Sequence, residues 1–398
     1  MTTSPALDPP PVELRRQPVW EQIRQGRRPD PDVVAEVAGS DRATVGAGGA
    51  AALRDAMTTR LLGAGPLEPL LDEVGVTDVA VNGDGSVWAD RGRGMERVGV
   101  DLGDAASVRR LVVRLAGQAG RRLDETAPYV DGLLPSGVRL HAVLPPIVAG
   151  GPHLTLRVPA RAALTLAELA EQGMFPPSWL PLVSALVRRR VSFLVSGGTG
   201  AGKTTLLGAM LAATSSAERI VVVEDVRELR VDREQMVSLE ARPPNVEGAG
   251  EITLTTLVRQ ALRMRPDRLV LGEARGPEVR ELLAALNTGH EGGCGTVHAN
   301  SAGDVVSRFE ALGALAGLDP AAVHAQLVSA VDVVIHLSRR DVGGVLRREL
   351  SGMGVLTRGA DGRPVVHQAL ALVEGVGRAG PGWPALRTLL AWPDEDPP

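Results

Sequence analysis

Residues 182–336 alternate between short apolar runs and longer segments in which apolar residues recur at helical spacing. The apolar runs predict buried strands, and the longer segments predict helices. The strands are expected at 191–195, 219–224, 235–240, 268–272, 295–298 and 332–336. The helices are expected at 182–189, 205–211, 253–264, 277–288, 302–315 and 321–330. This order predicts a largely parallel sheet with helices on both faces. Two later runs, 346–356 and 365–372, predict terminal strands.

The preceding stretch, 67–158, has a mixed pattern that predicts a small α/β domain. Residues 78–82 and 86–89 alternate like paired strands around a glycine-rich turn, which predicts a hairpin. Residues 107–119 have apolar positions at helical spacing. Three further strands are expected at 129–134, 138–144 and 153–158.

The other segments lack these patterns. Residues 1–50 are rich in Pro, Arg, Asp and Gly, which predicts a flexible arm, and a helix is expected at 50–62. Residues 159–181 are predicted to be a linker with a short helix, and residues 376–398 a Pro-rich tail. The predicted domains are therefore 51–158 and 182–375.

The first strand of the second domain leads into a phosphate-binding motif. The sequence is Gly197-Gly198-Thr199-Gly200-Ala201-Gly202-Lys203-Thr204, which fits G-x-x-x-x-G-K-[ST]. Glycines let the backbone wrap a phosphate, and their N–H groups form an anion site with the following helix start. Lys203 is expected to reach the β- and γ-phosphates of ATP, and Thr204 to ligate Mg²⁺. Thr205 completes the predicted nucleotide-binding set. A chance glycine-rich turn is the alternative, and the flanking strand and helix argue against it.

Composition supports the same interpretation. The chain has 43 Lys and Arg residues, and Lys203 is the only lysine among them. A lysine kept where every other cation is arginine indicates a role that arginine cannot fill. A compact ammonium on a flexible stem fits between phosphates where a planar guanidinium does not.

Two other predicted strands end in acids. Residues 268–272 lead into Glu273, which is placed to orient or deprotonate the attacking water. An ordinary strand-end carboxylate is the alternative. Residues 221–223 lead into Glu224, Asp225 and Glu228, and clustered carboxylates near a nucleotide hold Mg²⁺ through its waters. A solvated acidic turn is the alternative there.

Residues 288–300 are rich in glycine and contain His290 and His298. A glycine-rich approach beside a P-loop indicates a γ-phosphate sensor, although a lone histidine is more often structural. The segment lacks the further ligands that a metal site would need.

Composition also limits the function classes. The net charge of −4 gives no global basic field for nucleic acid, and 2% aromatic residues leave few stacking platforms. One cysteine excludes an internal disulfide and a four-cysteine zinc site. No apolar stretch is long enough to span a membrane, and no secretory signal is evident. We therefore expect a cytoplasmic protein that reaches the membrane through partners.

In order, these motifs resemble those of the type II/type IV secretion ATPase superfamily, and most closely its TadA/CpaF branch, which powers Tad (Flp) pilus assembly. The resemblance runs over about 61–350. Its marks are 62–71 (Leu-Gly-Ala-Gly-Pro-Leu-Glu-Pro-Leu-Leu), Arg139 through Pro145-Pro146, Arg157, the loop 197–204, the acidic box 224–228, 263–267 (Arg-Met-Arg-Pro-Asp), Gly272-Glu273 and the histidine box 288–300. The tetracysteine of the type II secretion and type IV pilus branches is missing.

The resemblance implies a RecA-like ATPase domain with a mainly parallel sheet, preceded by a smaller α/β (PAS-like) domain. It implies an ATP- and Mg²⁺-dependent homo-hexameric motor at the inner face of the cytoplasmic membrane, where polytopic platform proteins are its partners. Glu273 is implied as the catalytic glutamate and His298 as the histidine-box residue. Arg139, Arg157 and Arg263 are implied to contact the γ-phosphate.

Other functions stay open at this point. A DNA-handling motor of the conjugal-transfer type has a similar core, and DNA-stimulated hydrolysis would favour it. A non-catalytic nucleotide switch would not need Lys203, Thr204 and Glu273. A small-molecule kinase would need an acceptor pocket, which the sequence does not reveal.

Overall fold

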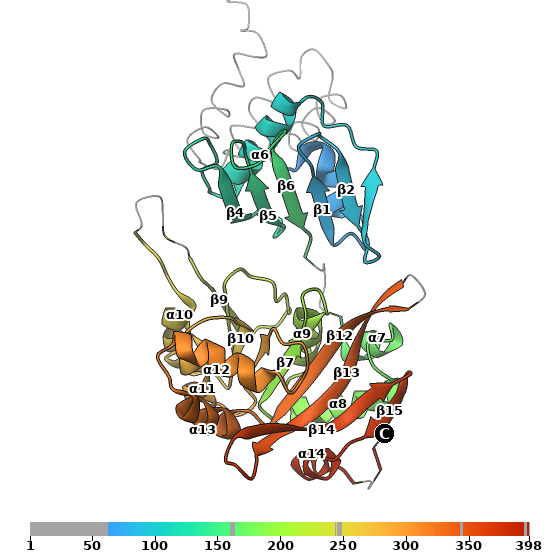
Figure 1. Ribbon diagram of the computed structural model, residues 1–398, viewed down its shortest axis with the longest axis vertical. Coiled ribbons are helices and arrows are strands. Elements are labelled where there is room, and N and C mark those ends of the chain that lie inside the picture. The colour runs from blue at the N-terminus through green and yellow to red at the C-terminus, as the bar shows by residue number, and fades with distance from the viewer. Residues whose placement is uncertain are drawn as a thin grey trace, which may run out of the picture. The chain divides into compact units, whose positions relative to one another are not determined.

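The computed structural model describes residues 63–159, 164–242, 244, 249–342, 345–393 and 396–397. The predicted arm at 1–50 and the predicted helix at 50–62 lie outside these residues. The chain divides into two compact units, Met1–Ala160 and Arg161–Pro398, which are described separately (Figure 1). Among the described residues, no helix has both the length and the apolar character that a membrane crossing requires.

The first unit is built on a six-stranded antiparallel sheet. Its strands are β1 (Asp78–Val81), β2 (Val87–Asp90), β3 (Met95–Val98), β4 (Tyr129–Leu133), β5 (Arg139–Val143) and β6 (His153–Arg157), in the order β3-β2-β1-β6-β5-β4. Helix α6 (Ala105–Gln118) begins at Asp104, whose side chain accepts from the Ser107 N–H. Its apolar side packs with alternate residues of the strands into one core, together with η1 (Gly65–Leu67) and α5 (Glu68–Asp72). The α/β prediction is confirmed here, and β3 is an additional strand.

The second unit contains a nine-stranded sheet. Its strands are β7 (Phe193–Gly197), β8 (Ile220–Glu224), β9 (Met236–Glu240), β10 (Arg268–Ala274), β11 (Cys294–Val297), β12 (Val333–Val342), β13 (Val345–Arg358), β14 (Pro364–Val373) and β15 (Val376–Ala379). The order is β15-β14-β13-β12-β7-β11-β10-β8-β9. All pairings from β12 to β9 are parallel, and β13, β14 and β15 are added antiparallel. The predicted, largely parallel sheet is therefore confirmed.

Helices cover both faces of this sheet. They are α7 (Leu166–Glu171), η2 (Pro177–Trp179), α8 (Leu180–Arg188), α9 (Lys203–Ala212), α10 (Leu254–Leu262), α11 (Val279–Leu286), α12 (Val305–Leu315), α13 (Pro320–Ala330) and α14 (Trp383–Leu390). One core joins Phe193 and Val195 of β7 to α7, α8, α9 and α14. The other core joins Leu194 to α10, α11, α12 and α13. Successive strand residues face opposite layers, which is why these strands are continuously apolar.

Two segments that the sequence analysis set aside are packed into the second unit. From Leu166 onward, the predicted linker forms α7, η2 and the start of α8, with Trp179 fully buried. Within the predicted tail, α14 buries Trp383 in the same core. The prolines of both segments indicate breaks in secondary structure when only the sequence is considered. Pro181 and Pro384 instead stand in the first turns of α8 and α14, where a missing N–H costs nothing.

Candidate functional site

The residues with predicted chemistry gather at the carboxyl edge of the parallel strands. The phosphate-binding loop follows β7, the acidic box follows β8, Glu273 ends β10 and His298 follows β11. In a parallel sheet these strand ends lie on one edge, which is where open α/β sheets bind ligands. The alternation of strands and helices thus brings four separate motifs together.

The loop after β7 has the conformation of a phosphate cradle. Gly200 and Gly202 have φ of 70° and 95°, and Gly202 is the N-cap of α9. Gly197 is required for a different reason. A Cβ there would lie 2.5 Å from the Leu337 carbonyl oxygen of the neighbouring strand β12. The loop is therefore held against the sheet while its N–H groups and the α9 N-terminus offer an anion site.

Lys203 is buried at the base of this cradle. Its Nζ donates to the carbonyl oxygens of Gly197 and Gly198, at 3.0 and 2.9 Å. The same Nζ lies 3.5 Å from Nδ1 and 3.4 Å from Nε2 of His298. The single lysine of the chain thus sits between the phosphate loop and the histidine box. The glycine φ values and this buried cation fit the polyphosphate of a nucleotide.

Glu273 is turned toward His298 by an irregularity of β10. The pairing of β10 with β11 shifts register between Leu271 and Ala274, and Glu273 lies inside that bulge. Its Oε1 lies 2.5 Å from Nε2 of His298. Thr296 donates to the Gly272 carbonyl oxygen at 2.6 Å and so fixes the bulge from the neighbouring strand. The implied catalytic glutamate and the histidine-box residue are therefore in direct contact.

The charge state of His298 follows from its surroundings. Burial lowers its pKa, the Lys203 ammonium lowers it further, and the Glu273 carboxylate opposes both. A neutral ring can donate Nε2–H to Glu273, while the Lys203 ammonium lies at nearly equal distance from both ring nitrogens. His298 therefore lies between the cation of Lys203 and the carboxylate of Glu273.

The predicted metal-binding residues separate into three environments. Thr204 donates to Glu228 at 3.4 Å, so these two lie together beside the loop. Asp225 forms an ion pair with Arg275. Glu224 is turned inward and accepts the N–H groups of Glu228 and Leu229 through Oε1.

Among the described residues, no group of three or more His, Cys, Asp or Glu side chains could hold a metal ion. The predicted set of Thr204, Glu224, Asp225 and Glu228 stays a prediction, and its members do not all lie together. Thr204 and Glu228 fit Mg²⁺, since this ion takes one or two protein ligands together with substrate phosphates and water.

Glu224 is a buried acid with a strongly shifted pKa. Its side chain packs on Gly272 of β10, at a point where any Cβ would clash, and its Oε2 has no hydrogen-bond partner in the described residues. Burial raises the pKa of Glu224 to about 7, against the opposing effect of the two N–H donors. Through these two N–H groups, Glu224 positions the acidic box.

Replacement of Glu224 by Gln is expected to change how stability depends on pH. Because the folded pKa is raised, ionisation opposes folding, and this cost grows as pH rises from about 4.5 to about 7. A shift of this size corresponds to about 3 kcal/mol of unfolding free energy. Denaturant unfolding without Mg²⁺ at pH 4.5 and 7.5 should show Glu224→Gln gaining up to that amount over wild type. An equal difference at both pH values would contradict it.

The three predicted arginines are divided between the two units. Arg139 and Arg157 face each other on β5 and β6 of the first unit. Arg263 closes α10 just before β10, so it lies at the amino edge of the second sheet. The phosphate loop is at the opposite edge, about 17 Å away along the length of a five-residue strand. This placement does not favour a γ-phosphate contact by Arg263 within its own chain, and the predicted contact stays untested. The other histidine of the histidine box, His290, precedes strand β11. Its Nδ1 contacts the Ala285 carbonyl oxygen near the end of α11.

Residues on β12 and β13 border the site and were missed by the sequence analysis. His336 contacts the Ser196 hydroxyl through Nδ1 at 2.9 Å, and burial lowers its pKa. Arg348 donates from Nε to the Gly200 carbonyl oxygen at 2.9 Å. No motif marks these positions. Only the pairing of β12 with β7 brings them to the loop.

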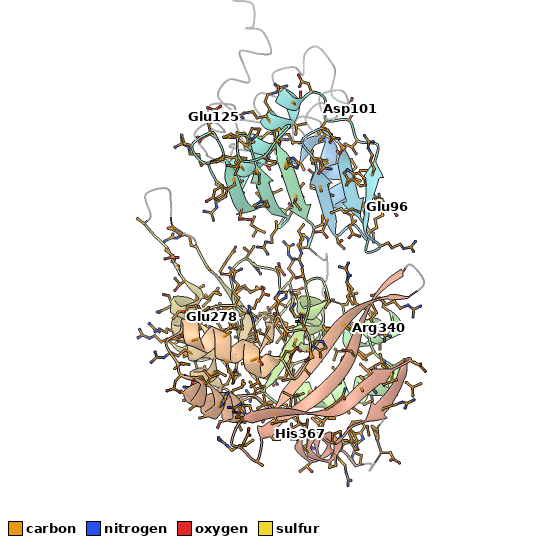
Figure 2. All side chains as sticks on the ribbon, in the orientation of Figure 1. Glu96, Asp101, Glu125, Glu278, Arg340 and His367 are labelled. Carbon is orange, nitrogen blue, oxygen red and sulfur yellow. The ribbon has the colours of Figure 1, made fainter. Side chains whose placement is uncertain are left out.

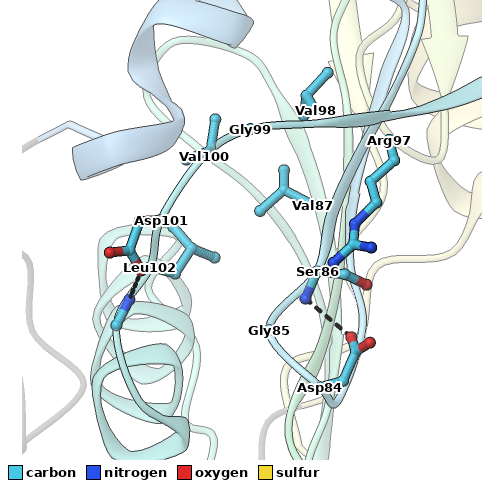
Figure 3. A pocket seen from close by; sticks show the side chains of 11 residues that line it. Asp84, Gly85, Ser86, Val87, Arg97, Val98, Gly99, Val100, Asp101 and Leu102 are labelled. Carbon is cyan, nitrogen blue, oxygen red and sulfur yellow. Dashed lines mark hydrogen bonds between the residues drawn. The ribbon is translucent and has the colours of Figure 1, made fainter.

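A separate hollow in the first unit is lined by residues 84–87 and 97–103 (Figure 3). The carboxylates that line it accept hydrogen bonds from backbone N–H groups of their own turns. Asp84 accepts the Ser86 N–H at 2.9 Å, and Asp101 accepts the Gly103 N–H at 2.8 Å. No residue of the phosphate loop lines it, and it adds nothing to the candidate site.

Comparison with known proteins identifies the family. The family model described as "Type II/IV secretion system protein" matches residues 60–370. A provisionally named conjugal transfer protein of Mycobacterium tuberculosis is 56% identical over 313 residues, covering 77% of this chain and 88% of that protein. The conjugal transfer protein TrbB of Rhizobium radiobacter is 31% identical, covering 70% and 84%.

A solved structure shares the fold. The ATPase DotB of Yersinia pseudotuberculosis superposes with a TM-score of 0.51 at 17% identity, covering 83% of this chain and 81% of that one. The fold is accordingly RecA-like, with a smaller α/β domain before it, as predicted.

Proposed function

The chain belongs to the type II/IV secretion system protein family, and from that premise we propose that it is a P-loop ATPase. In this proposal, it hydrolyses ATP to ADP and phosphate and powers pilus assembly or secretion. The observation that carries this is the convergence of Lys203, the Thr204–Glu228 pair and the Glu273–His298 pair at one sheet edge. A non-catalytic switch would not need the Glu273–His298 pair.

Each group has a distinct role in the proposed reaction. The loop N–H groups and Lys203 bind the β- and γ-phosphates, and Thr204 with Glu228 would hold Mg²⁺. Mg²⁺ supplies charge neutralisation on the phosphate oxygens. Glu273 orients the attacking water and accepts its proton, and His298 holds the Glu273 carboxylate in place through Nε2. These roles place hydrolysis at the carboxyl edge of the sheet.

We further propose that six copies form a ring at the cytoplasmic face of the membrane, recruited by polytopic platform proteins. Within each copy, Arg139 and Arg157 would reach the γ-phosphate when the two domains close, because paired guanidinium donors neutralise phosphate charge well. Bound ATP then favours the closed form through contacts that the open form lacks. Residues 166–179 of the predicted linker pack into the core of the second unit, so they would move with it.

Mixed rings test this arrangement. Lys203→Ala subunits are combined with Arg157→Ala subunits, and phosphate release is measured. If Arg157 serves its own chain, every site carries one defect and turnover stays low. Clear recovery of turnover on mixing would show that Arg157 serves a neighbouring subunit. A strictly monomeric protein in light scattering with an ATP analogue would contradict the ring itself.

The relatives favour one alternative, because two of them are named conjugal transfer proteins. The second candidate function is therefore a motor for DNA transfer. The two functions are separated by introducing Lys203→Ala in the native host and by adding DNA to the purified protein. Loss of surface pili or secreted protein, with no DNA stimulation of hydrolysis, supports the first. Loss of conjugation with DNA-stimulated hydrolysis supports the second.

A further inference from the structure

The β12–β13 hairpin has four arginines in two cross-strand pairs. Arg339 is directly opposite Arg348, and Arg340 is directly opposite Arg347. Directly opposite residues share a face of the ribbon, and successive residues lie on alternate faces. Arg339 and Arg348 therefore occupy one face, and Arg340, labelled in Figure 2, lies with Arg347 on the other.

The Arg339–Arg348 face is turned toward the phosphate loop. The Nε of Arg348 donates to the Gly200 carbonyl oxygen at 2.9 Å. The Nη1 of Arg339 lies 3.3 Å from the position that a Cβ on Gly200 would take. The Cδ of Arg348 lies 3.7 Å from the corresponding position on Gly202. Both exposed side chains thus border the middle of the loop.

The two faces differ in how their charge is balanced. On the face with Arg340 and Arg347, Arg340 forms an ion pair with Glu349 at 3.1 Å. On the loop face, no carboxylate of the described residues lies within ion-pair distance of Arg339 or Arg348. Like charges placed directly opposite each other oppose strand pairing. An anion that contacts both guanidinium groups would remove this repulsion.

We propose that Arg339 and Arg348 are a second set of phosphate-binding residues, acting with Lys203 on the same nucleoside di- or triphosphate. This rests on the proposed function, because the loop must bind a nucleotide. The arginines are well placed for it. β12 pairs with β7 through Leu337 and Gly197 and then continues as a strand past the loop, paired with β13. Guanidinium groups can give two parallel N–H donors to a phosphate.

Nucleotide affinity tests the proposal. Fluorescent ADP and a fluorescent non-hydrolysable ATP analogue are titrated, with Mg²⁺, into the wild type and into Arg339→Ala, Arg348→Ala and the double variant. Arg339→Ala should weaken both affinities by about tenfold, and the double variant by more, as expected for lost charge-assisted hydrogen bonds. Arg347→Ala is the matched control, since it removes the same charge from the opposite face, and its Kd should stay within about twofold of wild type.

Thermal unfolding gives an independent readout. Arg339 makes no hydrogen bond to the described residues, so its replacement removes only repulsion and should not lower Tm. Arg339→Lys should recover part of the lost affinity. Unchanged Kd values in Arg339→Ala and the double variant would overturn the proposal. So would a lower Tm and turnover in Arg348→Ala with unchanged Kd, which would make Arg348 a brace for Gly200. A wild type that binds neither nucleotide would instead overturn the proposed function itself.

Discussion

Replacement of Lys203 by Ala is expected to lower ATP turnover by about 10²–10³-fold or more, because the cation at the base of the loop is lost. The Lys203 ammonium is buried, and carbonyl oxygens of the loop orient it toward the cradle. A buried, oriented charge acts strongly on phosphates because little water screens it. The loss should be measured as phosphate release by purified protein in the presence of Mg²⁺.

Lys203→Arg is a second variant that separates the effect of charge from that of shape. It keeps the charge but replaces a compact ammonium by a planar fork, so it should remain strongly impaired. Unfolding curves for both variants check that the loop still folds, since the Nζ hydrogen bonds to Gly197 and Gly198 are also lost. Undiminished hydrolysis by Lys203→Ala, in preparations free of other ATPases, would refute the assignment.

Replacement of Glu273 by Gln is expected to slow turnover by about 10²-fold or more while nucleotide binding is retained. The amide oxygen can still accept from His298, so the geometry of the pair should be preserved. The amide cannot accept a proton from water. Single-turnover hydrolysis and nucleotide titration, measured on the same preparation, separate chemistry from binding.

Glu281→Gln provides the matched control for this experiment. Glu281 lies on α11, where its carboxylate pairs with Arg259, so its loss should leave turnover unchanged. Weak nucleotide binding by Glu273→Gln, with turnover little altered at saturation, would instead identify Glu273 as a structural or Mg²⁺-holding group.

The local parts of the site were predictable from sequence because each is a short segment with its own chemistry. The loop at 197–204 needs a strand, glycines and a helix start in succession, and all three are contiguous. Glu273 was found because it ends an apolar strand, and His298 because it lies in a glycine-rich segment; parallel strands bring both to one edge. Parallel order itself followed from the alternation of strands and helices.

The site contacts that the sequence did not predict depend on which strands are neighbours in the sheet. Nothing in the sequence says that β12, far along the chain, pairs with β7, and this pairing alone brings His336 and Arg348 to the loop. The Arg275–Asp225 ion pair likewise joins the ends of neighbouring strands. For Arg263, a motif was located correctly, but the edge of the sheet on which it lies was not considered.

The single lysine makes the nucleotide site chemically unique in this chain. Apart from the amino terminus, Lys203 has the only primary amine, and it is buried and hydrogen-bonded within the loop. Amine-directed acylation of the folded protein therefore has one side-chain target, and any side-chain adduct detected by mass spectrometry reports the accessibility of that loop. For the same reason, amine-coupled cross-linkers cannot join neighbouring subunits through surface lysines. Surveys of subunit contacts must use carboxylate- or arginine-directed chemistry.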